Sequence, residues 1–242
     1  MAIPRRAIIA VTSYNEPFYA DGEKTGLFYT EALHPYNELV SKGFEVDFVS
    51  ETGTYGIDSH SISDMFMDAQ DMKEYNDKEF AMNQKLAHIK KASEINPEEY
   101  GLFFASAGHA TLFDYPKAVC LQSIASDIWG RGGVVSAVCH GPAILPKIID
   151  KETGKSIIAG KQVTGFTTLG EEQLDLLDII KKSGCETIEE SAASVGAKYI
   201  SPEHPFDDFI IAQGRLVTGA NPASAKSTAA AAIAAFELAL SS

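Results

Sequence analysis

The chain has 242 residues, 45% of them hydrophobic, and a formal net charge of −13. This length can bury a sizeable core, and no linker, low-complexity run or internal repeat divides it, so we expect one domain over residues 1–242. The acidic balance and the lack of clustered Lys and Arg argue against nucleic acid or an anionic membrane surface as a partner.

The cysteines and the apolar stretches indicate the cellular setting. Cys120, Cys139 and Cys185 form no CxxC motif and are odd in number, which argues against a disulfide framework or a structural zinc site. The apolar stretch 229–240 is shorter than the roughly 20 residues of a membrane span and contains Glu237, which predicts a buried helix. We therefore expect a protein of the cytoplasm, with the nucleus also open, and no membrane partner.

Apolar runs of strand length alternate with helical patterns over the first 150 residues. The expected strands are 6–12, 44–50, 100–106 and 134–138, and the expected helices are 27–42, 78–91, 115–129 and 141–149. A polar region, 51–76, interrupts this order and predicts a cap or insertion. Continuous apolar strands in β-α-β order indicate a parallel sheet that helices cover on both faces.

The last third combines a short strand, two helices and a hairpin. We expect a strand at 161–164, an amphipathic helix at 170–182, and strands at 209–212 and 215–218 around a Gln-Gly turn. Asn221 and Pro222 are the residue types that open a helix, here the final one. The predicted fold class is α/β: a flavodoxin-like parallel sheet with helices on both faces, plus a β-hairpin and a small polar insertion.

Three of the expected strands are followed by residues that can take part in catalysis or binding. Gly108 and His109 follow strand 100–106, Cys139 and His140 follow strand 134–138, and Glu171 lies just beyond strand 161–164. Active sites of open parallel sheets gather at the carboxyl ends of the strands. These segments are therefore the candidate site.

Cys139 occupies a sharp strand-to-helix turn, where a nucleophile is exposed. A lone cysteine after an apolar strand is more often a small buried hydrophobe, but the Cys-His-Gly-Pro turn favours the nucleophile here. The N–H groups of the expected helix should lower the thiol pKa from about 8.5. Cys120 and Cys185 lack this context, and we interpret both as structural.

His140 is the candidate base beside Cys139, although adjacent residues rarely face each other. A reversal of the chain at the turn can bring the imidazole next to the sulfur, and the ring then needs an orienting acceptor. Glu171 is one candidate acceptor. An ordinary first-turn acid that complements a helix dipole explains Glu171 equally well.

Four segments of the chain resemble the signature segments of the ThiJ/PfpI superfamily: SAVCHGPAIL, FFASAGHATLFDYPKA, VTGFTTLGEE and RLVTGANPASA. The segment TSYNEPFYADGEKTGLFYTEALHP is similar to the fungal glutathione-independent glyoxalase III and heat-shock chaperone subgroup. The resemblance implies a Cys139, His140 and Glu171 triad. It also implies that Glu31, otherwise an ordinary helix acid, is a protonated carboxyl beside the sulfur.

The resemblance further implies a reaction. Methylglyoxal and water become D-lactate through a cysteine hemithioacetal, with no glutathione, metal or other cofactor, in a lyase of the D-lactate dehydratase type. Gly108 and His109 would bind the substrate, and the amides of Gly108 and His140 would hold an oxyanion. The expected role is stress detoxification of 2-oxoaldehydes, and the expected assembly is a homodimer.

The chain departs from the family pattern at a structural turn, where Gln213-Gly214 replaces Asp-Gly, and at two places near the site. Ala110 stands where the family usually has Gly, and His204-Pro205-Phe206 replaces a Gly-Pro-Trp segment. A side chain at Ala110 should narrow the pocket mouth. We expect both changes to affect substrate size and catalytic efficiency, and to leave the triad unchanged.

Other functions are open on the same residues. The subgroup's second label predicts a stress-induced holding chaperone that binds unfolded client proteins, with Met65-Phe66-Met67 either as a contact surface or as a lid anchor. Protein deglycase and, less favoured, cysteine peptidase activity are further alternatives. An exposed thiolate at Cys139 would also oxidise readily.

We assign no metal site from the sequence. His60 lies near Asp58 and Asp64 in the polar region, but isolated His and Asp residues in acidic loops usually form a solvated face.

Overall fold

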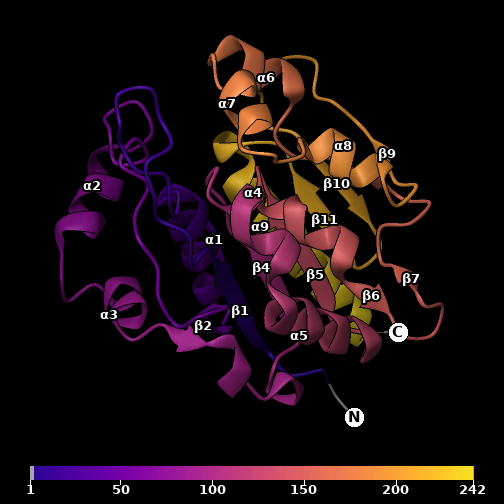
Figure 1. The fold of residues 1–242 in the computed structure, drawn as a ribbon. Helices are drawn as coiled ribbons and strands as arrows, with labels where there is room; N and C mark the ends of the chain where they lie inside the picture. Colours follow the sequence, from indigo (N-terminus) through magenta and orange to yellow (C-terminus); the bar gives the residue numbers. More distant parts are fainter. Residues whose placement is uncertain (1–2, 242) are drawn as a thin grey trace.

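A computed structural model describes residues 3–241 and contains a seven-stranded sheet in the order β10-β11-β5-β4-β1-β2-β3 (Figure 1). Its strands are β1 (Arg6–Val11), β2 (Glu45–Ser50), β3 (Lys90–Lys91), β4 (Leu102–Ala105), β5 (Val134–Val138), β10 (Ile210–Gln213) and β11 (Leu216–Gly219). Neighbouring strands run parallel except β10 and β11, which form the predicted antiparallel hairpin. The flavodoxin-like order is confirmed.

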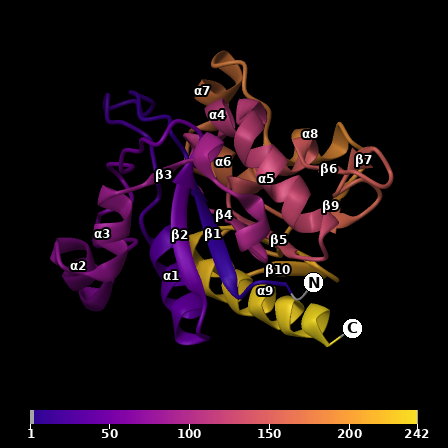
Figure 2. The same ribbon diagram turned by 90° about the horizontal axis from the view of Figure 1, so that it is seen from below.

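Helices cover both faces of this sheet. On one face lie α1 (Thr30–Ser41) and α9 (Ala225–Leu240), and on the other lie α5 (Val119–Gly130), η4 (Gly141–Lys147) and α8 (Ile188–Ala193) (Figure 2). Strand β1 shows why two cores form: Ala7, Ile9 and Val11 face α1 and α9, while Ile8 and Ala10 face the opposite layer. Successive side chains of a strand point to opposite faces, so a strand between two layers must be apolar throughout.

The remaining elements are short. The helices are α2 (Ala69–Asn76), α3 (Ala81–Ala87), α4 (Thr111–Asp114), α6 (Thr168–Gln173) and α7 (Leu177–Lys182), with 3₁₀ turns η1 (Ala92–Glu94), η2 (Pro97–Glu99), η3 (Tyr115–Lys117) and η5 (Pro222–Ser224). Two small sheets pair β6 (Ile149–Asp150) with β7 (Lys155–Ser156), and β8 (Gln162–Val163) with β9 (Lys198–Tyr199). Within residues 3–241, no helix combines the length and apolarity needed to cross a membrane.

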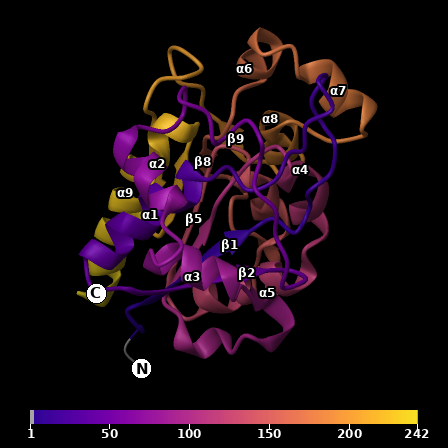
Figure 3. The same ribbon diagram turned by 90° about the vertical axis from the view of Figure 1, so that its left-hand side faces the viewer.

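The polar region 51–76 lies outside the sheet. It ends in α2, which Figures 1 and 3 show with α3 beside α1, at the β2 edge of the molecule. The imidazole Nε2 of His34 on α1 bonds the Asp71 carboxylate of α2 at 3.1 and 3.2 Å. Met67 is buried, whereas Met65 is 83% exposed. One methionine therefore anchors the segment and the other is available to a pocket or a partner.

Three local predictions are wrong. Strand 161–164 pairs with β9 in a separate small sheet, so Glu171 does not follow a strand of the main sheet. Helix 170–182 divides into α6 and α7, because Asp175 is left-handed with φ of 57° and ends the first helix. Segment 141–149 forms a 3₁₀ helix, since Pro142 and Pro146 provide no N–H for α-helical bonds.

Candidate active site

The backbone at the end of β5 holds Cys139 in a strained conformation. Its φ is +56°, a left-handed value that is uncommon for a residue with a side chain. The Cys139 N–H donates to the Gly219 carbonyl at 2.9 Å, and the Phe166 N–H donates to the Cys139 carbonyl at 2.8 Å. At Gly141 a Cβ would lie 2.5 Å from the Ala105 carbonyl oxygen, so only glycine permits this turn. The predicted elbow is present.

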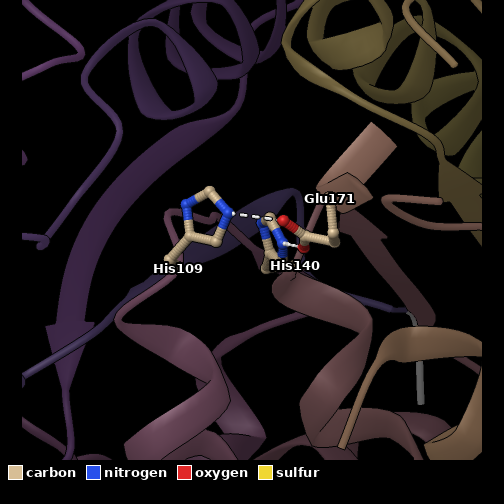
Figure 4. Close-up of side chains that lie close together, drawn as sticks. All are labelled: His109, His140 and Glu171. Atoms are coloured by element: carbon tan, nitrogen blue, oxygen red, sulfur yellow. Dashed lines mark hydrogen bonds and ion pairs between the residues drawn. The ribbon is translucent and has the colours of Figure 1, made fainter. Parts of the chain in front are cut away.

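His140 bridges Cys139 and Glu171, and Figure 4 shows its contact with Glu171. Its Nδ1 lies 3.2 Å from the Cys139 sulfur, and its Nε2 lies 2.5 Å from Glu171 Oε1. A carboxylate can only accept, so the ring proton sits on Nε2 and the bare Nδ1 can accept from the thiol. The turn thus brings two adjacent side chains together, as predicted from the reversal of the chain.

His109 donates to the other oxygen of the same carboxylate. Its Nε2 lies 3.0 Å from Glu171 Oε2, and the rings of His109 and His140 have centroids 4.1 Å apart (Figure 4). Burial disfavours the Glu171 carboxylate, but its charge interactions and hydrogen bonds with the two histidines outweigh burial and hold its pKa well below the usual range. Glu171 is therefore an anion at neutral pH that orients both rings.

Glu31 lies in the first turn of α1 and is fully buried next to the Cys139 sulfur. Burial raises its pKa to about 8, against a smaller lowering from its contact with Cys139. Within residues 3–241, neither carboxyl oxygen of Glu31 makes a hydrogen bond of ordinary geometry. The expected neutral carboxyl is thus beside the thiol and within reach of the sulfur, in a contact outside ordinary hydrogen-bond geometry.

The thiol of Cys139 differs from the prediction. Burial and the nearby carboxyls of Glu31 and Glu171 raise its pKa well above the ordinary value, while the His140 N–H lowers it. The short 3₁₀ helix that follows offers less of the dipole assumed from the sequence. Burial also lowers the pKa of His140. The resting pair is a thiol beside a neutral imidazole, which can take the proton during attack.

Cys139, His140 and His109 border a cavity of about 710 Å³. Its floor consists of Gly108, His109, Cys139 and His140. Its rim consists of the apolar side chains of Met65, Phe66, Leu174 and Phe206, which are 83, 37, 45 and 48% exposed. Buried polar groups below apolar walls are the usual composition of a small-molecule site.

The two departures from the family pattern have different outcomes. Phe206 is part of the rim, so the replacement there does change the cavity wall. Ala110 is fully buried, its N–H donates to Thr25 Oγ1 at 3.0 Å, and it does not border the cavity. The prediction that Ala110 narrows the mouth is wrong.

A second polar group beside the cavity escaped the sequence reasoning. Asp58 is fully buried and accepts hydrogen bonds from Tyr19 Oη at 2.8 Å and Thr25 Oγ1 at 2.9 Å. The Tyr19 ring stacks on His60, whose Nε2 lies 2.9 Å from Asp21. Asp58 and His60 thus serve in a hydrogen-bonded wall. The only signal in the sequence was that these residues occupy a polar region between two predicted elements.

Among residues 3–241, the group of His, Cys, Asp and Glu side chains with metal-ligand spacing is His109, His140 and Glu171, whose donor atoms lie within 4.8 Å of one another. All three residues were predicted to lie in the candidate site, but no metal-ligand spacing is recognisable among positions that are 31 or more apart along the chain.

The fold and the elbow define the class of protein. The chain belongs to the DJ-1/PfpI family, whose model matches residues 25–235. It is 54% identical over 226 residues to the protein named glutathione-independent glyoxalase HSP31 of Saccharomyces cerevisiae, covering 93% of this chain and 95% of the relative. It is also similar to the crystal structure of glyoxalase III from Candida albicans, with a TM-score of 0.94, 50% identity, and coverage of 96% and 98% of the two chains.

Proposed function

We propose that this protein is a glutathione-independent glyoxalase that converts methylglyoxal and water to D-lactate. The observation that carries the proposal is the Cys139, His140 and Glu171 relay, with the neutral carboxyl of Glu31 beside the sulfur. Two relatives that are 54 and 50% identical to nearly the whole chain carry glyoxalase names, which supports an enzyme acting on a small molecule. The floor of the cavity supplies the groups that this reaction needs.

The first step is addition of sulfur to the aldehyde carbon. His140 Nδ1, 3.2 Å from the sulfur, takes the thiol proton as the carbon–sulfur bond forms. The aldehyde oxygen develops negative charge toward the amides of Gly108 and His140, which border the cavity with Cys139. Return of the proton to that oxygen completes the hemithioacetal. Glu171 is a positioning residue here, because it acts through His140.

The second step moves a proton between the two former carbonyl carbons. His140 removes the proton from C1 to give an enediol, and a proton returns to C2. C1 is thereby oxidised to a thioester and C2 reduced to an alcohol, so no external oxidant or reductant is required. Water then hydrolyses the thioester, releasing lactate and the Cys139 thiol.

D-lactate formation from methylglyoxal tests the proposal. Reduced protein without glutathione should form D-lactate, and Cys139→Ser should reduce kcat by at least roughly 10³-fold, as loss of a triad nucleophile does. Cys185→Ser, which changes a thiol away from the cavity, is the matched control and should retain activity. Absence of D-lactate from the reduced wild-type protein, or equal activity in Cys139→Ser, would overturn the proposal.

A holding-chaperone role is a second candidate, and the exposed apolar rim favours it. Met65, Leu174 and Phe206 present apolar surface at the cavity mouth, which suits contact with exposed apolar segments of unfolded proteins. We propose this role as separate from the thiol chemistry. Suppression of aggregation that persists in Cys139→Ser and falls in a rim variant supports it, and the opposite pattern refutes it.

Assembly and location are also proposals. We propose a homodimer in the cytoplasm, with the nucleus as a second compartment, from the resemblance and from the unpaired cysteines. Native mass spectrometry tests the dimer, and imaging of the tagged protein tests the location. Deglycase and peptidase activity are weaker alternatives. Glycated and unmodified peptides that stay unreacted, while free methylglyoxal is converted to D-lactate, would exclude both.

A further inference from the structure

A three-ligand cluster, which the proposed reaction does not use as such, joins His109 and His140 of the cavity floor to Glu171 behind them. His109 Nε2 and His140 Nε2 both point at the Glu171 carboxylate, and all three side chains are at least 90% buried (Figure 4). Two imidazole nitrogens and one carboxylate oxygen form a ligand set typical of zinc sites that keep an open fourth position.

We propose that this cluster binds one Zn²⁺ ion, as a reversible inhibitor. The present distances from Glu171 oxygens to the histidine nitrogens, 3.0 and 2.5 Å, are those of hydrogen bonds. In a tetrahedral zinc site ligand atoms are separated by roughly 3.3 Å. The two carboxylate–imidazole distances therefore need to lengthen by less than about 1 Å. The three donor atoms already lie within 4.8 Å of one another, so a small rotation of the two rings brings their nitrogens to the same spacing.

Access and charge both suit the ion. His109 and His140 border the cavity, so an ion can enter from solvent and a cavity water can take the fourth position. Glu171 presents one carboxylate oxygen to each ring, at 3.0 Å from His109 Nε2 and 2.5 Å from His140 Nε2. The two imidazoles and the carboxylate then carry a single negative charge against the double positive charge of zinc, and nitrogen-rich sets of this kind favour zinc over magnesium or calcium.

Zinc binding would remove the base. Coordination uses the Nε2 lone pair, so in His140 the ring proton moves from Nε2 to Nδ1. His140 Nδ1 then carries a hydrogen and can no longer accept one from the Cys139 sulfur, 3.2 Å away. The ion thus inhibits without touching the thiol, because Cys139 faces the opposite nitrogen of the ring.

Calorimetric titration of the reduced, metal-free protein with Zn²⁺ tests the site without using activity. The wild-type protein should bind one ion, and Cys139→Ser should bind it equally well. His109→Gln should weaken binding by more than roughly 100-fold, since loss of an outer partner alone can cost that much. His88→Gln, which changes a surface histidine at the end of α3, is the matched control and should bind like wild type.

Spectroscopy with Co²⁺ keeps the test valid if His109→Gln fails to fold. The wild-type protein with Co²⁺ should show visible bands of four-coordinate cobalt and no near-ultraviolet sulfur-to-metal band. A strong sulfur band, loss of binding in Cys139→Ser, or unchanged affinity in folded His109→Gln would each overturn the proposal.

If the protein forms D-lactate, stoichiometric Zn²⁺ should abolish D-lactate formation and EDTA should restore it. Binding without inhibition would refute the inhibitory role. A protein that binds zinc but forms no D-lactate would refute the glyoxalase proposal alone.

Discussion

The floor and the rim of the cavity are built in different ways. The floor side chains follow β4 and β5, are at least 90% buried, and are held by backbone bonds between neighbouring strands. The rim side chains come from loops far apart in the sequence, around residues 65, 174 and 206, and are more than a third exposed. Chemistry is thus fixed by the sheet, whereas the contacts that select a substrate or a partner are supplied by separate, exposed segments.

The same contrast exists in the electrostatics. On the floor and directly behind it, burial moves the pKa values of Glu31, Cys139 and His140 so that all three are neutral near pH 7, with Glu171 as the buried anion. The rim is apolar and has no such coupling. Perturbed groups that converge on one cavity are typical of catalytic sites.

The largest expected effect comes from the base on the floor. His140→Gln removes the nitrogen that accepts the thiol proton, and kcat/KM for methylglyoxal should fall by roughly 10²- to 10⁴-fold. Leu174→Ala on the rim should change kcat/KM by less than about threefold. Steady-state kinetics of both folded variants measure the difference, and equal losses would erase the distinction between floor and rim.

Glu31→Gln should increase stability at neutral pH. The folded-state pKa of about 8 exceeds the ordinary 4.5, so the folded protein binds more protons and loses stability as pH rises from 4.5 to 8. At pH 7 the raised pKa of Glu31 lowers the free energy of unfolding by about 3 kcal/mol, and the uncharged glutamine side chain avoids this loss. Denaturant unfolding should show a large stabilisation at pH 7 and a small one at pH 5. A variant less stable than wild type at pH 7 would mean that Glu31 has a stabilising partner.

The pH profile of kcat/KM should be bell-shaped. Because the pKa of His140 is lowered from 6.5, the base stays neutral until the pH drops below 6.5, and the acid limb lies there. Ionisation of Glu31 near pH 8 places a second negative charge beside the reacting sulfur, so the rate should fall about tenfold per unit above that pH. In Glu31→Gln the alkaline limb should disappear; its persistence near pH 8 would assign it to another group.

The smallest effect on catalysis is expected at the cap. Replacing Met65 and Phe66 by serine should change kcat/KM for methylglyoxal by less than about threefold, because a substrate of five heavy atoms reaches the floor without filling the rim. The same change should reduce suppression of client aggregation, measured by light scattering. A large loss of turnover would show that the rim takes part in positioning the substrate.

The sheet and the elbow could be predicted because their physics is local. Strand β5 is continuously apolar, and a Cys-His-Gly-Pro turn after it can adopt few conformations. The division of helix 170–182 could not be predicted, since apolar residues recur at helical spacing on both sides of Asp175, while the backbone turns left-handed at that residue. The break between α6 and α7 brings residues 174–176 to the cavity.

The pKa shifts of the residues in and behind the floor were harder to predict than the fold. The thiol pKa was predicted to fall from a helix terminus, but its direction depends on burial and on Glu31, which is more than 100 positions away. Glu31 itself was found only through the resemblance, because on α1 it has the pattern of a surface acid. The contact of His109 with Glu171 likewise joins segments that only the folded chain brings together.

The most direct test of the account is to locate the covalent intermediate. Reduced protein turning over methylglyoxal is quenched in acid, digested and analysed by mass spectrometry. We expect a lactoyl thioester on Cys139 and on neither Cys120 nor Cys185, and no such adduct in Cys139→Ser. D-lactate formation with an unmodified Cys139, or an intermediate on another cysteine, would contradict the role of Cys139 as the nucleophile.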